Sequence, residues 1–219
     1  MKFAAKELGW SVARVKKADK KHRKLKAFKA NGNIFESGQT IDEDTHRYMR
    51  WLAEQRLKDV FDILLIEEDE NTRETPKRIA KVWAGDSLAC DTELGGGRFS
   101  KPVRLPKFPN DDSRERWIEK EVRLISTCSH HFLPFTGTAV IKYKPNKFVL
   151  GISKLQRLTN YVANRFYLQE DLTVALHNLI MEAAEVSYED VQVKIVAEHS
   201  CEMNRGVKNL NCKFTTEEK

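Results

Sequence analysis

The sequence predicts an α+β fold in which an N-terminal helical region precedes an antiparallel β-β-α-α-β-β sheet with a helix pair on one face. Two observations predict it. Apolar residues recur at helical spacing through the first half of the chain, and after about residue 118 β-branched and aromatic runs flank two further helical stretches. We divide the chain into a basic arm (1–38), a helical region with a loop (39–117) and a sheet domain (118–219).

Composition narrows the class of protein. Of 219 residues, 41% are hydrophobic and 32% charged, which is typical of a globular chain. There is no run of eighteen apolar residues and no apolar core of a signal peptide, so we expect no membrane span and a cytoplasmic location. The four cysteines are too scattered for a disulfide scaffold and are interpreted as reduced thiols or metal ligands.

The positive charge is concentrated at the N-terminus. Residues 1–30 hold eleven Lys or Arg and two acids, a net charge of +9, so the other 189 residues carry −3. Ala5, Gly9 and Val15 have the spacing of a helix-turn-helix unit, but no helix precedes them to support it. We therefore interpret 1–38 as an arm, disordered or loosely helical, that ends at 31–33 and has a weak, non-specific affinity for nucleic acid.

Two helices are predicted before the sheet. Thr40 and Glu43 have capping-box spacing, and the following helix carries an apolar stripe that should face a core: Leu57, Val60, Phe61, Leu64 and Leu65. A second helix begins with Thr75 as N-cap and Pro76. Arg78 lies in its first turn, where a cation opposes the helix dipole, which suggests another use. Residues 85–117 are predicted to be loop.

The sheet domain follows as short segments. Strands are predicted at 121–128, 138–143, 148–152, 191–198 and 206–214. Ser153 and Gln156 have capping-box spacing before a helix with Leu155, Leu158 and Val162 on one face. A second helix presents Leu172, Leu176, Leu179, Ile180 and Ala183.

The bend between the first two strands carries metal-ligand chemistry. Cys128-Ser-His130-His131 places a thiol and two imidazoles together, and His199 and Cys201 add a second pair. Two thiolates and one imidazole leave a fourth position open, as in catalytic zinc sites. Spacing does not decide whether His130 or His131 is the ligand. The alternative is that these are ordinary residues of a buried strand and turn.

Five motifs in this order resemble GTP cyclohydrolase I, over roughly residues 40–214: 71–81 (NTRETPKRIAK), 128–135 (CSHHFLPF), 151–157 (GISKLQR), 168–173 (LQEDLT) and 199–206 (HSC…RG). The resemblance implies a tunnelling fold over 118–219, a toroidal homo-oligomer, commonly a decamer, and active sites shared between neighbouring subunits. It implies hydrolysis of GTP to 7,8-dihydroneopterin triphosphate and formate, with Zn²⁺ held by Cys128, His131 and Cys201.

The resemblance also implies roles for other residues. His130 is the general acid toward the guanine ring, His199 transfers protons near the ribose, and Ser153 assists the rearrangement. The substrate-binding set comprises Glu170 and Gln169 for guanine and Lys154, Arg157, Arg205 and Arg78 for the triphosphate. Glu170 can accept hydrogen bonds from guanine N1–H and the exocyclic amine together.

Three features depart from the family pattern. Ser129 stands where the family usually has glutamate, the chain ends soon after the last predicted strand, and the basic arm matches no family motif. Two other hypotheses stay open: a tunnelling-fold purine or pterin enzyme with another substrate, and a nucleic-acid-binding ring protein that acts through the arm.

Overall fold

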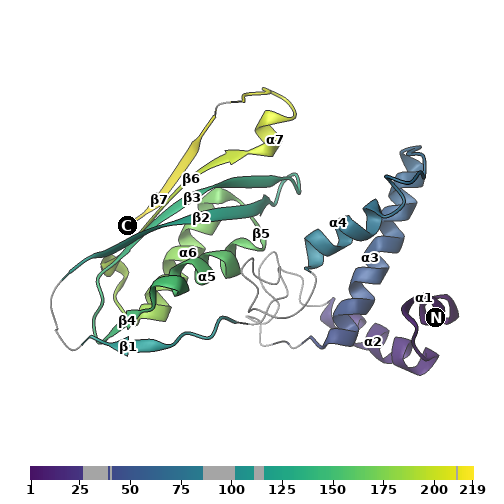
Figure 1. Ribbon diagram of the computed structural model, residues 1–219, viewed down its shortest axis with the longest axis horizontal. Coiled ribbons are helices and arrows are strands. Elements are labelled where there is room, and N and C mark those ends of the chain that lie inside the picture. Colours follow the sequence, from purple (N-terminus) through teal and green to yellow (C-terminus); the bar gives the residue numbers. More distant parts are fainter. Residues whose placement is uncertain (27–38, 40, 86–101, 111–115, 211) are drawn as a thin grey trace. The chain divides into compact units, whose positions relative to one another are not determined.

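The computed structural model describes residues 1–26, 39, 41–85, 102–110, 116–210 and 212–219 (Figure 1). The predicted end of the arm (31–33), Thr40 and most of the predicted loop 85–117 lie outside these ranges. The chain divides into an N-terminal helical unit and a C-terminal sheet unit, each described by itself. None of the helices in the described ranges is long and apolar enough to cross a membrane.

The described residues of the N-terminal unit form the α-helices α1 (Lys2–Leu8), α2 (Val12–Leu25), α3 (Glu43–Ile63) and α4 (Thr75–Ala84). Residues 2–25 thus form two defined helices where a disordered or loosely helical arm was expected. The reason is tertiary, because apolar side chains of α1 and α2 pack against Tyr48, Trp51 and Leu52 of α3. The supporting helix follows these two helices in the chain instead of preceding them.

Helix α3 differs from the prediction in its cap and in its apolar stripe. Asp42 is the N-cap, and its carboxylate accepts a hydrogen bond from the backbone N–H of Thr45 at 2.8 Å. The stripe predicted to face a core is wrong for this chain, since Val60, Leu64 and Leu65 are 44%, 63% and 90% exposed. Helices α1 and α2 contact α3 near Tyr48, so its last turns extend beyond them (Figure 1).

The sheet unit confirms a mixed helix and sheet fold. Its main sheet has the order β5-β2-β3-β6-β7, in which β5 is parallel to β2 and every other pair is antiparallel. The strands are β2 (Ile118–Cys128), β3 (Pro134–Tyr143), β5 (Phe166–Tyr167), β6 (Val191–His199) and β7 (Phe214–Glu218). A small second sheet pairs β1 (Lys107–Pro109), in the stretch predicted as loop, with β4 (Phe148–Leu150).

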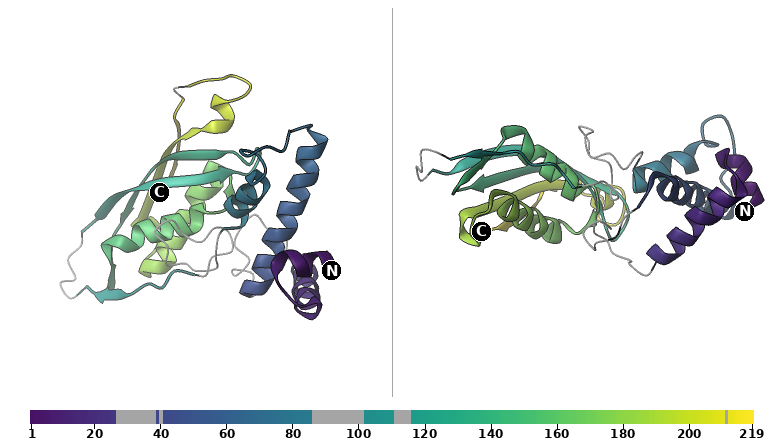
Figure 2. Two further views of the ribbon diagram at one scale, coloured as in Figure 1. Left: turned by 45° about the vertical axis from the view of Figure 1, so that its right-hand side comes forward. Right: turned by 90° about the horizontal axis from the view of Figure 1, so that it is seen from below.

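Helices α5 (Ile152–Ala163) and α6 (Gln169–Ala184) cover one face of the main sheet (Figure 2). Their apolar stripes lie in the core, where Leu158, Leu172 and Leu176 are at most 1% exposed. The capping box predicted at Ser153 is wrong, because the N-cap of α5 is Gly151, two residues earlier, without a side-chain cap. Two short helices complete the unit, the 3₁₀ helix Tyr188–Asp190 and α7 (Ser200–Met203).

The last strand also lies later than predicted. Residues 206–214 were expected to be strand, but pairing with β6 begins at Phe214, opposite Ala197. Gly206 and Lys208 have φ of 59° and 51°, left-handed conformations that turn the chain instead of extending it. The strand prediction was therefore wrong before Phe214.

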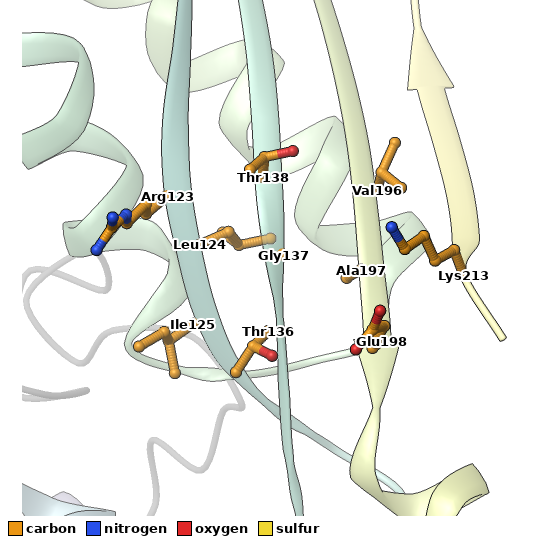
Figure 3. Close-up of a pocket in the computed structure, with 10 residues that line it drawn as sticks. All are labelled: Arg123, Leu124, Ile125, Thr136, Gly137, Thr138, Val196, Ala197, Glu198 and Lys213. Atoms are coloured by element: carbon orange, nitrogen blue, oxygen red, sulfur yellow. The ribbon is translucent and has the colours of Figure 1, made fainter. Parts of the chain in front are cut away.

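The face of the sheet opposite the helices is hollowed. A cavity of about 450 Å³ lies over β2, β3 and β6, between side chains such as Arg123, Thr138 and Glu198 (Figure 3). Gly137 lines it, and a Cβ atom there would lie 2.0 Å from the carbonyl oxygen of Val196. Glycine therefore allows β3 and β6 to approach closely at this point.

Candidate active site

The strand order brings the two cysteine-containing motifs together. Because β2 and β6 are both antiparallel to β3, their C-terminal ends lie at the same edge of the sheet. Cys128 is the last residue of β2, His199 is the last residue of β6, and Cys201 lies in α7 directly after it. Two segments about seventy residues apart thus meet at one edge.

These three residues form a compact donor cluster. The ligand atoms of Cys128, His199 and Cys201 all lie within 4.8 Å of one another. Cys128 is buried, while His199 and Cys201 are half-buried. Two sulfurs and an imidazole nitrogen are donors suited to zinc, so the residues present fit this metal.

The turn after Cys128 places the other two histidines. It is closed by hydrogen bonds from Phe132 N–H to Cys128 C=O and from Cys128 N–H to Leu133 C=O, both 2.9 Å. His131 Nδ1 lies 3.8 Å from Cys128 Sγ. His130 is exposed, and its ring centre lies 5.9 Å from that of His131. Both imidazoles therefore lie beside the cluster.

Arg205 reaches the same turn. Its guanidinium donates to His131 Nε2 at 2.6 Å. Desolvation, followed by the nearby charges of Arg205 and His130, lowers the pKa of His131. A residue predicted to bind phosphate thus lies beside a predicted metal ligand.

Burial shifts the pKa values of two residues of the cluster, His199 and Cys201. Desolvation lowers the pKa of His199, although the charges of Glu170 and Glu202 oppose it. Burial also raises the pKa of the Cys201 thiol, and the neighbouring Cys128 raises it further. Two thiols this close repel each other as thiolates, so a cation is needed to hold both in the ionised form.

Two contacts orient His199. Its ring stacks on Phe135, with centroids 4.5 Å apart and planes at 11°. Its Nε2 lies 2.9 Å from Gln169 Oε1, and because that oxygen only accepts, Nε2 is the donor. Gln169 Nε2 donates in turn to the carbonyl oxygens of Ile195 and Phe214. Gln169 thus anchors His199 to β6 and β7.

The roles of Gln169 and Phe135 in orienting His199 were not predicted from the sequence. Gln169 was expected to contact the substrate, yet it is 1% exposed and its amide is occupied by protein partners. In the sequence, Phe135 is only an apolar residue near the start of a predicted strand, which does not indicate that its ring stacks on a histidine. The neighbouring Glu170 is exposed, and it is close enough for its charge to oppose the lowering of the His199 pKa by burial.

Other predicted site residues lie elsewhere in the chain. Ser153, Lys154 and Arg157 are in the first turns of α5, where the carbonyl of Ile152 accepts a hydrogen bond from Lys120. Lys120 and Cys128 lie near opposite ends of β2, about 26 Å apart at the rise of an extended strand. Gln156, next to Arg157, bonds the backbone of Arg123, which lies about 17 Å from Cys128 at the same rise. One chain therefore does not bring these residues to the cluster. Arg78 belongs to the N-terminal unit, in α4.

Comparisons with known proteins identify the family. The sequence model of GTP cyclohydrolase I matches residues 53–219. The chain belongs to the GTP cyclohydrolase I family of enzymes. A protein named GTP cyclohydrolase 1 from Thermoanaerobacter pseudethanolicus is 39% identical over 164 residues, which are 73% of this chain and 82% of that protein.

Further relatives carry the same name. The protein from Clostridium kluyveri is 37% identical over 150 residues (68% of this chain, 76% of that protein), and that from Parabacteroides distasonis is 32% identical over 180 residues (80% and 86%). A solved structure of an archaeosine synthase QueF-like protein aligns with 47% of this chain and 92% of its own, at 17% identity and a TM-score of 0.34. That score is too low to bear on the fold.

Proposed function

We propose that this member of the GTP cyclohydrolase I family hydrolyses GTP to 7,8-dihydroneopterin triphosphate and formate with a bound zinc ion. The observation that carries the proposal is the convergence of Cys128, His199 and Cys201 within 4.8 Å, with His131 beside them, in a chain whose residues 53–219 match the family.

The thiolates of Cys128 and Cys201 and the imidazole of His131 would hold the metal, with His199 beside it. When bound, zinc acts as a Lewis acid and lowers the pKa of water to about 7, which makes a nucleophile available at neutral pH. The resemblance favours His131 as the third ligand, and its Nδ1 lies 3.8 Å from Cys128 Sγ. An imidazole that accepts from Arg205 at Nε2 carries its proton on Nδ1, so ligation through Nδ1 would require the hydrogen bond from Arg205 to open. Metal content of the His131→Ala and His199→Ala variants distinguishes the two imidazoles.

Proton transfer is assigned to the two remaining histidines. His130 is exposed at the turn, where a substrate could reach it, and would protonate the guanine imidazole ring at the nitrogen next to C8. His199 is held by Gln169 and Phe135, and burial lowers its pKa, which favours the neutral imidazole that a proton acceptor needs. Glu170, exposed near His199, would recognise guanine.

The position of the proposed triphosphate-binding residues supports an active site that is shared between neighbouring chains. Lys154 and Arg157, with the backbone N–H groups at the start of α5, form a natural anion site. Because this part of α5 lies about 17 to 26 Å along β2 from Cys128, the two halves of the site would come from neighbouring chains. We therefore propose a toroidal homo-oligomer of the tunnelling fold, with a decamer as the expected size.

The test is incubation of the purified, zinc-loaded chain with GTP, with formate and pterin fluorescence measured together. We expect both products in equal amounts, and ATP, which cannot pair with Glu170, should give neither. A mixture of two inactive variants, Cys201→Ala and Arg157→Ala, should regain activity if the sites are shared between chains. Absence of formate release from GTP would overturn the proposal.

A further inference from the structure

Helices α1 and α2 form a helix–turn–helix unit. Only Gly9, Trp10 and Ser11 separate them, and Gly9 has φ of 66°, a left-handed conformation that glycine adopts without strain. Ser11 caps α2 by accepting from the N–H of Arg14 at 3.2 Å. A three-residue turn that contains glycine is the connection found in helix-turn-helix motifs.

One face of this unit is packed. Ala4, Ala5, Leu8, Trp10, Val15 and Ala18 are all at most 8% exposed and form one apolar cluster with Tyr48 of α3. Of the three residues at helix-turn-helix spacing, Ala5 and Val15 belong to this cluster, and Gly9 lies in the turn between the two helices. Helix α3 thus supplies the third helix that such a unit needs.

The opposite face of α2 is a lysine face, defined as Lys16, Lys17, Lys20 and Lys24. All four are exposed. At about 100° per residue they and Ala13 occupy an arc of about 100° that points away from Val15 and Ala18. The buried face of the helix is therefore apolar and its exposed face cationic.

The other cations of α2 have partners in the fold. Arg14 donates to Asp44 at 2.8 Å and stacks on Trp10, Lys21 pairs with Asp42, and Arg23 pairs with Asp19. Among the ion pairs between described residues, none involves a member of the lysine face. These four charges are available to a polyanion.

We propose that the lysine face of α2 binds double-stranded DNA, with α2 lying in the major groove. An exposed helix of about 21 Å fits this groove, and the N-terminal residues of the second helix, here Val12 and Ala13, then approach the bases. The major groove of double-stranded RNA is too narrow for a helix. An anionic membrane is excluded as the preferred ligand because the apolar face of α2 is already buried on α3.

This binding activity would be separate from hydrolysis of GTP. Helices α1 and α2 precede residue 53, where the match to the GTP cyclohydrolase I family begins. None of the residues assigned to catalysis or substrate binding lies in α1 or α2. Loss of DNA binding should therefore leave the turnover of GTP unchanged.

The first experiment measures affinity for a fluorescent DNA duplex of about two helical turns, with the full-length, zinc-loaded chain at about 50 to 200 mM salt. Lys16→Gln/Lys20→Gln should weaken binding about tenfold or more. The logarithm of the association constant should then fall less steeply with the logarithm of the salt concentration, with the size of the slope smaller by about 2. The control Lys58→Gln/Lys77→Gln removes the same charge from α3 and α4 and should change the affinity little.

A second pair of variants separates DNA contact from folding. Ala13→Glu adds a carboxylate to the first turn of α2, which favours the helix dipole, but it would repel phosphates in the groove. It should weaken binding about tenfold, whereas Ala13→Gln, of the same size, should not. The proposal is overturned if the wild-type chain does not bind the duplex, if the lysine-face and Ala13→Glu variants bind it normally, or if duplex RNA or anionic vesicles bind equally well.

Discussion

The two units of this chain use polar residues in different ways. In the sheet unit, Cys128, His199 and Cys201 come from segments distant in sequence and gather where two strands end. In the N-terminal unit, the four residues of the lysine face come from one helix and follow its period. A reactive site needs convergence of different groups on one point, while a surface for a polyanion needs repetition of one charge.

This difference affects what substitution should do. In the sheet unit, the loss of one residue of the cluster should also disable the others, so substitution there should lower catalytic turnover strongly. Removal of one member of a repeated set should give graded effects on affinity.

Loss of a thiolate should have the largest effect. On the proposed function, Cys201→Ala should abolish stable binding of zinc and lower the turnover of GTP by at least about 10³-fold, because the bound metal would supply several kcal/mol of transition-state stabilisation. Metal content and formate release measure this. Cys212→Ala, which removes a thiol outside the cluster, is the control and should keep both metal and activity.

Loss of the proposed acid should be smaller and should spare the metal. His130→Ala should lower turnover about 10²- to 10⁴-fold with normal zinc content, because His130 is assigned to proton transfer alone. Full activity in this variant would show that another group protonates the ring.

Core substitutions should separate the buried stripe of α6 from the exposed stripe of α3. Leu176→Ala should lower the free energy of unfolding by about 2–5 kcal/mol, because Leu176 is 0% exposed. Leu64→Ala should change it by no more than about 0.5 kcal/mol, because Leu64 is 63% exposed. Denaturant unfolding measures both, and equal losses would mean that the end of α3 is covered in solution.

The cap of α3 should give the smallest effect, and it depends on pH. Burial acts to raise the pKa of Asp42, but hydrogen bonds from Thr45 and Lys21 outweigh it and lower the pKa to about 2. A carboxyl whose pKa is lowered on folding stabilises the fold above its unfolded value of 3.8, and this stabilisation is lost as the pH falls toward about 2.

Asp42→Asn keeps a capping side chain but removes the charge. It should cost no more than about 1 kcal/mol near pH 7 and almost nothing near pH 2, as measured by thermal unfolding of the two proteins. A cost that does not change with pH would mean that the charge of Asp42 does not stabilise the helix.

Local patterns in the sequence predicted the two helices that cover the sheet and its longer strands. The stripes of α5 and α6 were predicted from period alone, because Leu155, Leu158, Leu172 and Leu176 each face the sheet. Period did not predict the exposure of Val60 and Leu64, since an apolar stripe shows that a helix can pack and not what covers it. The start of β7 was missed because the two left-handed residues 206 and 208 leave little trace in composition.

The linear sequence was enough to show which groups are available for chemistry: two thiols, their neighbouring histidines and a segment of dense positive charge. It also identified the family, because motifs of fixed spacing survive in the linear chain. The packing of distant segments was needed to show that Gln169 holds His199, that Lys154 lies far from Cys128 within one chain, and that residues 2–25 fold onto α3. Hydrogen bonds and apolar contacts between distant segments depend on how strands and helices pack, which no local pattern encodes.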